Sequence, residues 1–387
     1  MTEIATIEAV AAEATEWRRD IHRHPELQYD VHRTAAKVAG LLRSFGCDQV
    51  VEGVGRTGVV GVIGGRGAGR SIGLRADMDA LPITEQTGAA YASTVPGKMH
   101  ACGHDGHTAM LLGAAKRLAA TRDFSGQAVI VFQPAEEGGA GGRAMVQDGL
   151  MERFAIEEIY GLHNMPGLAP GHFAIRPGPL MASSDVFDIA ITGRGGHAAK
   201  PDECIDTVVV AAQIVTALQT IVSRNVDPVK SAVVSVTAID VGEAYNVIAQ
   251  TCRMKGTARA LEPSVRDLLE RRIVEVAGLT AQALGAQAVA RYSRHYPVTR
   301  NHPLQTNFCA EVARQVAGSD NVDAEAVPVM GGEDFSFMLE ARPGAFIFLG
   351  NGDSAGLHHP AYDFNDAIIA TGIRYWTSLA QARLAAA

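Results

Sequence analysis

The sequence predicts an α/β protein in which a second domain is inserted into the first. Three observations support this fold class: helix-like and strand-like segments alternate over residues 1–181, the pattern changes over 182–294, and helix and strand segments return over 295–387. Such alternation is expected of a mixed α/β sheet. A chain of 387 residues also exceeds one comfortable hydrophobic core, which favours two domains.

The segments of the first domain are recognised by the spacing of their apolar residues. Helix-like periodicity covers 7–22, 34–45 and 108–120, and strand-like runs cover 59–63, 72–74 and 128–132. We expect this domain to be discontinuous and to comprise 1–181 and 295–387.

The inserted segment, 182–294, has a different order of elements. Strand-like runs and helix-like stretches follow one another as strand 186–191, helix 207–222, strand 232–239, strand 250–258, helix 265–283 and strand 288–292. The order β-α-β-β-α-β is that of the split ferredoxin-like unit. The sequence therefore predicts a small α/β sandwich between the two parts of the first domain.

Composition narrows the classes of protein that this chain can belong to. Apolar residues make up 47% and charged residues 20%, enough for a packed core, and the net charge of −8 argues against a non-specific nucleic-acid surface. The five cysteines are scattered and show no disulfide framework. The first residues lack the basic start and apolar core of a secretion signal, and no uninterrupted apolar run reaches the length of a membrane span. We expect a cytoplasmic protein without nucleic-acid or membrane partners.

Residues 99–107 gather the side chains that bind metals. They include Cys102 and His104, together with further imidazoles and a carboxylate, within nine residues. A single Cys/His pair is more often structural than a metal site. The metal interpretation therefore depends on the clusters that follow.

A pair of carboxylates, Glu136 and Glu137, follows the buried strand-like run 127–132 after three residues. Neighbouring side chains at a strand end point in different directions, so one can bind a metal while the next faces water or substrate. An isolated pair would more simply be a solvated turn. The glycines that follow favour a site, because they let backbone and ligand approach closely.

Two further loops contribute histidines: His163 ends a short apolar strand, and His358 and His359 lie almost two hundred residues later. The four loops supply enough ligands for two divalent ions. A mixture of thiolate, imidazole and carboxylate suits zinc, manganese, cobalt or nickel better than magnesium alone.

Together these motifs resemble the aminoacylase and carboxypeptidase family of dinuclear metallohydrolases. The motifs occur in one order along nearly the whole chain: LRADMDALPI at 74–83, HACGHDGHTAMLLGAA at 100–115, QPAEEGG at 133–139, LHNMPGL at 162–168, GRGGHAAKP at 193–201, YNVIAQ at 245–250 and GGEDFSFM at 331–338. The chain is most similar to the branch that holds hippurate hydrolases, bacterial N-acyl-amino-acid amidohydrolases and plant auxin-conjugate hydrolases.

The resemblance implies a role for each residue of the predicted site. The family's metal ligands fall on Cys102, His104, Glu137, His163 and His358, and its general base falls on Glu136. We choose His358 over His359, because the position of His359 is often not a ligand in similar proteins. Asp77 and Asp79 lie where other branches carry a His-x-Asp metal motif, and here they are expected to support the ligands. The chain departs from similar proteins at 30–32, where a glutamate pair is usual.

For the inserted domain, the resemblance implies a lid and a dimer contact. His197 would stabilise the oxyanion, often in the partner's site, although a histidine in a glycine-rich loop is by itself more simply a loop residue. Asn246 and Arg259 would bind substrate, Arg259 through a bidentate contact with a carboxylate, or they are ordinary polar residues at strand ends. We expect a homodimer that pairs sheet edges.

The resemblance implies a hydrolase with two divalent ions per subunit, zinc or manganese first, that cleaves hippurate-like or N-acetyl amino acids. Metal ions lower the pKa of water, and Glu136 would take the proton and deliver it to the leaving amine. A dipeptidase or carboxypeptidase is the close alternative, distinguished by an acidic partner for a free α-amino group. A catalytically silent binding protein is a third, opposed by the intact pair Glu136 and Glu137.

Overall fold

The computed structural model describes residues 5–385, which form two compact units. The first unit takes its described residues from Met1–Leu180, Arg300–Val327 and Asp334–Ala387, and the second comprises Met181–Thr299 and Pro328–Glu333. A two-stranded pair of β7 (Gly178–Met181) and β14 (Thr299–Asn301) lies where the chain passes from one unit to the other and returns.

An eight-stranded mixed sheet forms the centre of the first unit, in the order β1-β2-β4-β3-β5-β16-β6-β15. The strands have these bounds: β1 Gln49–Val54, β2 Gly58–Gly64, β3 Ser71–Asp77, β4 Gln127–Gln133, β5 Glu158–Pro166, β6 Phe173–Ala174, β15 Val322–Asp323 and β16 Gly344–Gly352. The neighbours β4, β3, β5 and β16 run parallel. Every residue of β3 is buried, as expected of a strand covered on both faces.

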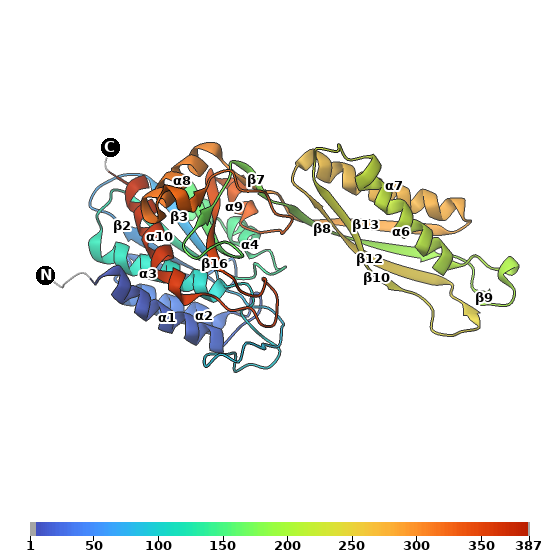
Figure 1. The fold of residues 1–387 in the computed structure, drawn as a ribbon, viewed down its shortest axis with the longest axis horizontal. Helices are drawn as coiled ribbons and strands as arrows, with labels where there is room; N and C mark the ends of the chain where they lie inside the picture. Colours follow the sequence, from blue (N-terminus) through green and yellow to red (C-terminus); the bar gives the residue numbers. More distant parts are fainter. Residues whose placement is uncertain (1–4, 386–387) are drawn as a thin grey trace. The chain divides into compact units, whose positions relative to one another are not determined.

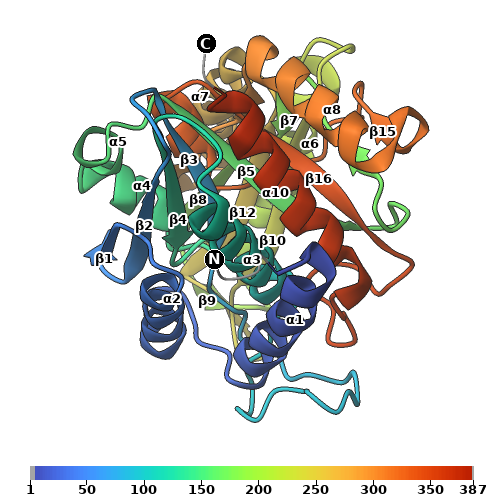
Figure 2. The ribbon, with the colours of Figure 1, turned by 90° about the vertical axis from the view of Figure 1, so that its left-hand side faces the viewer.

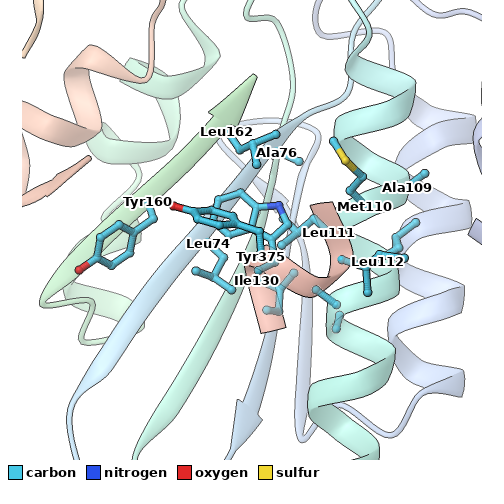
Figure 3. Packing of buried hydrophobic residues seen from close by; sticks show 14 of the residues in the cluster. Leu74, Ala76, Ala109, Met110, Leu111, Leu112, Ile130, Tyr160, Leu162 and Tyr375 are labelled. Atoms are coloured by element: carbon cyan, nitrogen blue, oxygen red, sulfur yellow. The ribbon is translucent and has the colours of Figure 1, made fainter. Parts of the chain in front are cut away.

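Helices cover this sheet. Their bounds are α1 Ile7–Arg23, α2 His32–Ser44, α3 His104–Thr121, α4 Gly141–Gln147, α5 Leu150–Arg153, α8 Pro303–Ala317, α9 Ser336–Ala341 and α10 Ile369–Arg383. Figure 2 shows α1, α3 and α10 together on one face, where α3 packs against both of the others. In Figure 3, Leu74 of β3 and Leu162 of β5 face the α3 side chains Met110 and Leu111 across the core.

The second unit is a four-stranded antiparallel sheet in the order β10-β12-β8-β13, with two helices on one face (Figure 1). Its elements are β8 Ser183–Thr192, α6 Thr207–Arg224, β10 Ala232–Asp240, β12 Thr251–Ala260, α7 Pro263–Ala283 and β13 Gln287–Tyr296, in the order expected from the sequence. The short strands β9 (Gly196–His197) and β11 (Val247–Ile248) pair with each other and were not expected. Helix α6 is long and apolar enough to cross a membrane by composition, and its Val210, Ile214 and Leu218 are buried in this unit's core.

The mixed α/β fold class is confirmed, but one helix boundary was wrong. Apolar periodicity begins the third helix at 108, whereas α3 begins at His104. The first turn consists of His104, Asp105, Gly106 and His107, which are all buried. The polar side chains of this turn therefore do not face solvent, although their polarity suggested a loop. The helix follows Gly103, whose φ of 90° requires glycine.

Glu158, the first residue of β5, joins this strand to two helices of the first unit. Its carboxylate accepts hydrogen bonds from Arg383 of α10 at 2.5 and 2.6 Å, Gln305 of α8 at 3.1 Å and Tyr160 at 2.7 Å. Burial would raise the pKa of Glu158, but these donors outweigh it and lower the pKa to about 2.

We predict that Glu158→Gln lowers the free energy of unfolding near neutral pH by about 1.5–3 kcal/mol, because it removes hydrogen bonds to a charged group. A lowered pKa stabilises the fold above the ordinary value of 4.5, and this contribution is lost as pH falls toward about 2. Urea unfolding of the wild-type protein and the variant, in EDTA at pH 6 and pH 3, measures the free energy of unfolding of each. The difference between the two proteins should be smaller at pH 3 than at pH 6. An equal difference at both pH values would contradict the lowered pKa of Glu158.

Candidate metal centre

The candidate ligands lie at one edge of the first unit's sheet. Asp77 ends β3, Glu136 and Glu137 follow β4, and His163 lies near the end of β5. Because β3 is parallel to both β4 and β5, these ends meet at the same edge. In sheets of this type, ligands bind beyond the carboxyl ends of the strands.

Cys102, His104 and His163 form a buried triad whose donor atoms lie within 4.8 Å of one another. Cys102 Sγ is 3.4 Å from His163 Nε2. Among the described residues, neither ring nitrogen of His104 has a hydrogen-bond partner, and three carboxylate oxygens lie 3.6 to 3.9 Å away. A buried imidazole without partners is costly, so this geometry fits a ring nitrogen that binds a cation.

A second triad, Cys102, Glu137 and His358, shares the cysteine. His358 Nε2 is 3.2 Å from Glu137 Oε1, and the His358 backbone N–H donates to Ala101 O at 2.8 Å. The side chain of His358 is 53% exposed, whereas that of Glu137 is 12% exposed. This triad therefore lies at the open side of the cluster, where a substrate could reach it.

The electrostatics of the cluster favour cations. Burial raises the pKa of the Cys102 thiol well above its usual range, and Glu137, Glu136 and Asp77 raise it further. Burial would lower the pKa of His104, but Asp77 and Asp79 raise it to about 10. The buried carboxylates thus favour positive charge at this point. A bound metal ion would supply that charge while the thiol and imidazole lose their protons.

Asp77 and Asp79 hold other residues in place. Asp79 accepts hydrogen bonds from the backbone N–H groups of Glu136 at 2.9 Å and Glu137 at 3.1 Å, which fixes the loop that carries both carboxylates. Asp77 Oδ1 lies 2.6 Å from His107 Nδ1, and Arg75 Nη1 donates to Asp77 Oδ2 at 2.7 Å. Both carboxylates thus hold neighbouring residues, and their supporting role toward the metal ligands stays a prediction.

The structure adds residues to which sequence reasoning assigned no role. His107 Nε2 lies 2.7 Å from Asn164 Oδ1, and Asn164 Nδ2 donates to Tyr362 OH at 2.6 Å. Both ring nitrogens of His107 are therefore within hydrogen-bond distance of Asp77 or Asn164, while Asp77, His104 and His107 also have donor atoms within 4.8 Å of one another. Position was the only available signal: Asn164 directly follows His163 at the strand end.

His197, Asn246 and Arg259 belong to the second unit, so their part in the site stays a prediction. His197 is exposed in β9, paired with Val247 of β11, and Ala198 N donates to Asn246 O at 3.0 Å. Arg259 in β12 donates through Nε to Thr257 Oγ1 at 3.2 Å, and burial lowers the pKa of its guanidinium.

Comparison with known proteins fits this cluster. The model of peptidase family M20/M25/M40 matches residues 73–382. The chain belongs to this family. It is 43% identical to a hippurate hydrolase of Campylobacter jejuni over 94% of both chains, and 41% identical to thermostable carboxypeptidase 1 of Saccharolobus solfataricus over 86% of this chain and 84% of that one.

A solved structure from Bacillus subtilis, described as a dinuclear metal binding peptidase of the M20 family, matches with a TM-score of 0.85. It is 34% identical, and the match covers 97% of this chain and 99% of that one. The predicted family and mixed α/β fold are confirmed, and the chain is a hydrolase of this family.

We predict that Gly103→Ala disrupts the metal centre. An added Cβ would lie closer than 3.0 Å to Asn164 Oδ1 and Tyr362 OH, so the loop between Cys102 and His104 must shift. Because small misplacements are costly in catalysis, kcat/KM should fall about 10²-fold, and metal content by elemental analysis should fall with it. Gly46→Ala is the matched control, since its φ of 81° is similar but its Cβ meets open space. Equal effects of the two changes would contradict this prediction.

Proposed function

We propose that the protein is an amidohydrolase that removes the acyl group from N-acyl amino acids, with two divalent ions held by Cys102, His104, Glu137, His163 and His358. The observation that carries this proposal is the pair of triads that share Cys102, with the additional carboxylate of Glu136 beside them. Zinc or manganese suits the ligand mixture best, with cobalt or nickel as alternatives.

Bound metal ions would supply Lewis-acid chemistry and lower the pKa of water. Glu136 is 7% exposed, and Asp79 holds its backbone. Its carboxylate takes the proton from the attacking water oxygen and then delivers that proton to the amide nitrogen as the carbon–nitrogen bond breaks. Water is consumed, and the products are a carboxylic acid and a free amino acid.

The names of the relatives support this class of substrate. A hippurate hydrolase and a carboxypeptidase both indicate an amide whose leaving nitrogen carries a nearby carboxylate. Arg259 is our candidate for that carboxylate, and His197 for the oxyanion. A carboxypeptidase or dipeptidase remains the second candidate because of the archaeal relative. Turnover of a panel of N-acyl amino acids and dipeptides, with added zinc or manganese, separates the two activities.

We also propose a cytoplasmic homodimer. All five cysteines are free, and a thiol ligand at Cys102 needs a reducing compartment. The four-stranded sheet of the second unit has β10 and β13 at its edges, and Val289 of β13 is 62% exposed. Edge strands of this kind can pair across a two-fold axis.

We predict that Glu136→Gln cuts kcat by about 10² or more, the usual contribution of a general base, and leaves the bound metal unchanged. Glu137→Gln is the paired variant: it should lower metal content, because it removes a ligand. Elemental analysis and steady-state kinetics of both proteins provide the measurement. Near wild-type turnover by metal-loaded Glu136→Gln would remove this residue from the role of base.

Mixing two inactive variants tests the dimer. If His197 acts in the partner's site, a heterodimer of Glu136→Gln and His197→Ala contains one site with both defects and one intact site. Subunit exchange should then recover about half of the wild-type activity per heterodimer, by counting sites in a symmetric pair. No recovery in a demonstrated heterodimer would show that His197 does not act across the interface, and would leave the metal chemistry standing.

A further inference from the structure

Two segments near the ends of the chain carry charged side chains that have no part in the proposed mechanism. One is 18–22, in α1, and the other is 362–366, which precedes α10. In the first unit, 18–22 contributes Arg18 and His22 to a buried charge cluster made of Arg18, His22, Glu85 and Asp105, and Asp366 of the second segment pairs with Arg18. The side chains of Arg18, His22 and Asp105 have no exposed surface, and that of Glu85 is 5% exposed.

Asp105 lies at the centre of this charge cluster and directly follows the candidate ligand His104. Two side chains of α1 meet one oxygen of Asp105, Oδ2: His22 Nδ1 at 2.8 Å and Arg18 Nη1 at 3.1 Å. The other oxygen, Oδ1, has no hydrogen-bond partner within residues 5–385. His22 and Arg18 therefore provide the hydrogen bonds that hold this carboxylate.

The charge cluster also holds the segment that leads into the ligands from the other side. His22 Nε2 lies 3.3 Å from Glu85 Oε1, and Glu85 Oε2 accepts the Ser93 N–H at 2.6 Å. Arg18 Nε lies 2.5 Å from Asp366 Oδ1, and its guanidinium is 4.4 Å from the Tyr91 ring. His22 thus links the loop before Cys102 to the helix that begins at His104.

The charges of these groups are complementary. Burial would lower the pKa of His22, but Asp105 and Glu85 outweigh it and raise the pKa to about 9. The ring is therefore protonated near neutral pH and forms ion pairs with both carboxylates. Removal of one partner of a buried ion pair strongly destabilises the surrounding structure, because the other charge stays buried without compensation.

The position of the first turn of α3 depends on contacts such as those that Asp105 makes with His22 and Arg18. Its N-cap residue, Gly103, provides no side-chain hydrogen bond. Cys102 and His104 flank this glycine, whose φ of 90° makes the turn between them sharp. Tertiary contacts of the first helical turn, those of Asp105 among them, therefore fix where the two ligands point.

We propose that His22 is a positioning residue for the metal centre: through Asp105 and Glu85 it holds the turn that presents Cys102 and His104 to the metal. This inference rests on the proposed ligand set. Residues that orient metal ligands commonly change metal affinity by 10- to 100-fold when they are replaced. We expect an effect of that size although His22 is not itself among the candidate ligands.

The test is the dissociation constant of zinc for His22→Gln, measured by competition with a chromophoric chelator after EDTA treatment. We expect binding to weaken at least tenfold while the far-ultraviolet circular dichroism spectrum stays unchanged. Val10→Ala is the matched control, because Val10 is a buried residue of α1 that packs near Gly113 of α3 and lies outside the charge cluster. It should lower the Tm and leave the zinc affinity unchanged.

Glu85→Gln provides a second variant if His22→Gln fails to fold. It removes only the outer ion pair of His22, so zinc binding should weaken less, by a few-fold. Unchanged zinc affinity in the folded variants, or an equal loss in Val10→Ala, would overturn the positioning role. Failure of the wild-type protein to bind zinc at these residues would instead overturn the ligand assignment itself.

Discussion

Burial of four carboxylates around a thiol and an imidazole is the constraint on which the rest of the first unit depends. Asp77, Asp79, Glu136 and Glu137 converge on His104 at one edge of the sheet, where little solvent can screen them. Charges buried in this way are tolerated only when cations or hydrogen-bond donors compensate them. The fold supplies part of this compensation through its own residues, and bound metal ions would supply the remainder.

The compensation by protein groups reaches well beyond the ligands. Arg75 is fully buried in β3 and contacts Asp77, Gln133 and Asp334, which ties the central strands to the C-terminal part of the first unit. Asp334 also accepts the N–H of Gly142 at 2.7 Å. The sheet, the loop after β4 and the C-terminal segment are therefore held by charges next to the candidate ligands, so a metal ion bound there would also stabilise the fold.

Much of this arrangement could be predicted from the sequence, for a definite reason. Strands that are buried on both faces are recognised in the sequence as continuous apolar runs. Residues of the types that bind metals, when they follow such a run, can therefore be placed at the edge of the sheet. Residues whose meaning depends on distant partners could not be placed. Asn164 donates a hydrogen bond to Tyr362, which lies 198 residues away in the sequence, and His22 contacts Asp105, which lies 83 residues away. The start of α3 was missed because a helical turn buried among charges lacks the apolar periodicity that marks a helix.

In the proposed metal centre, two ions share Cys102. Anomalous diffraction from crystals grown with zinc, recorded on both sides of the zinc absorption edge, tests it most directly. We expect two peaks in the first unit, each at about 2.3 Å from Cys102 Sγ, the usual zinc–sulfur distance. One of them should also contact His163, and the other His358. A single peak, or two peaks that both lie away from Cys102, would contradict the account.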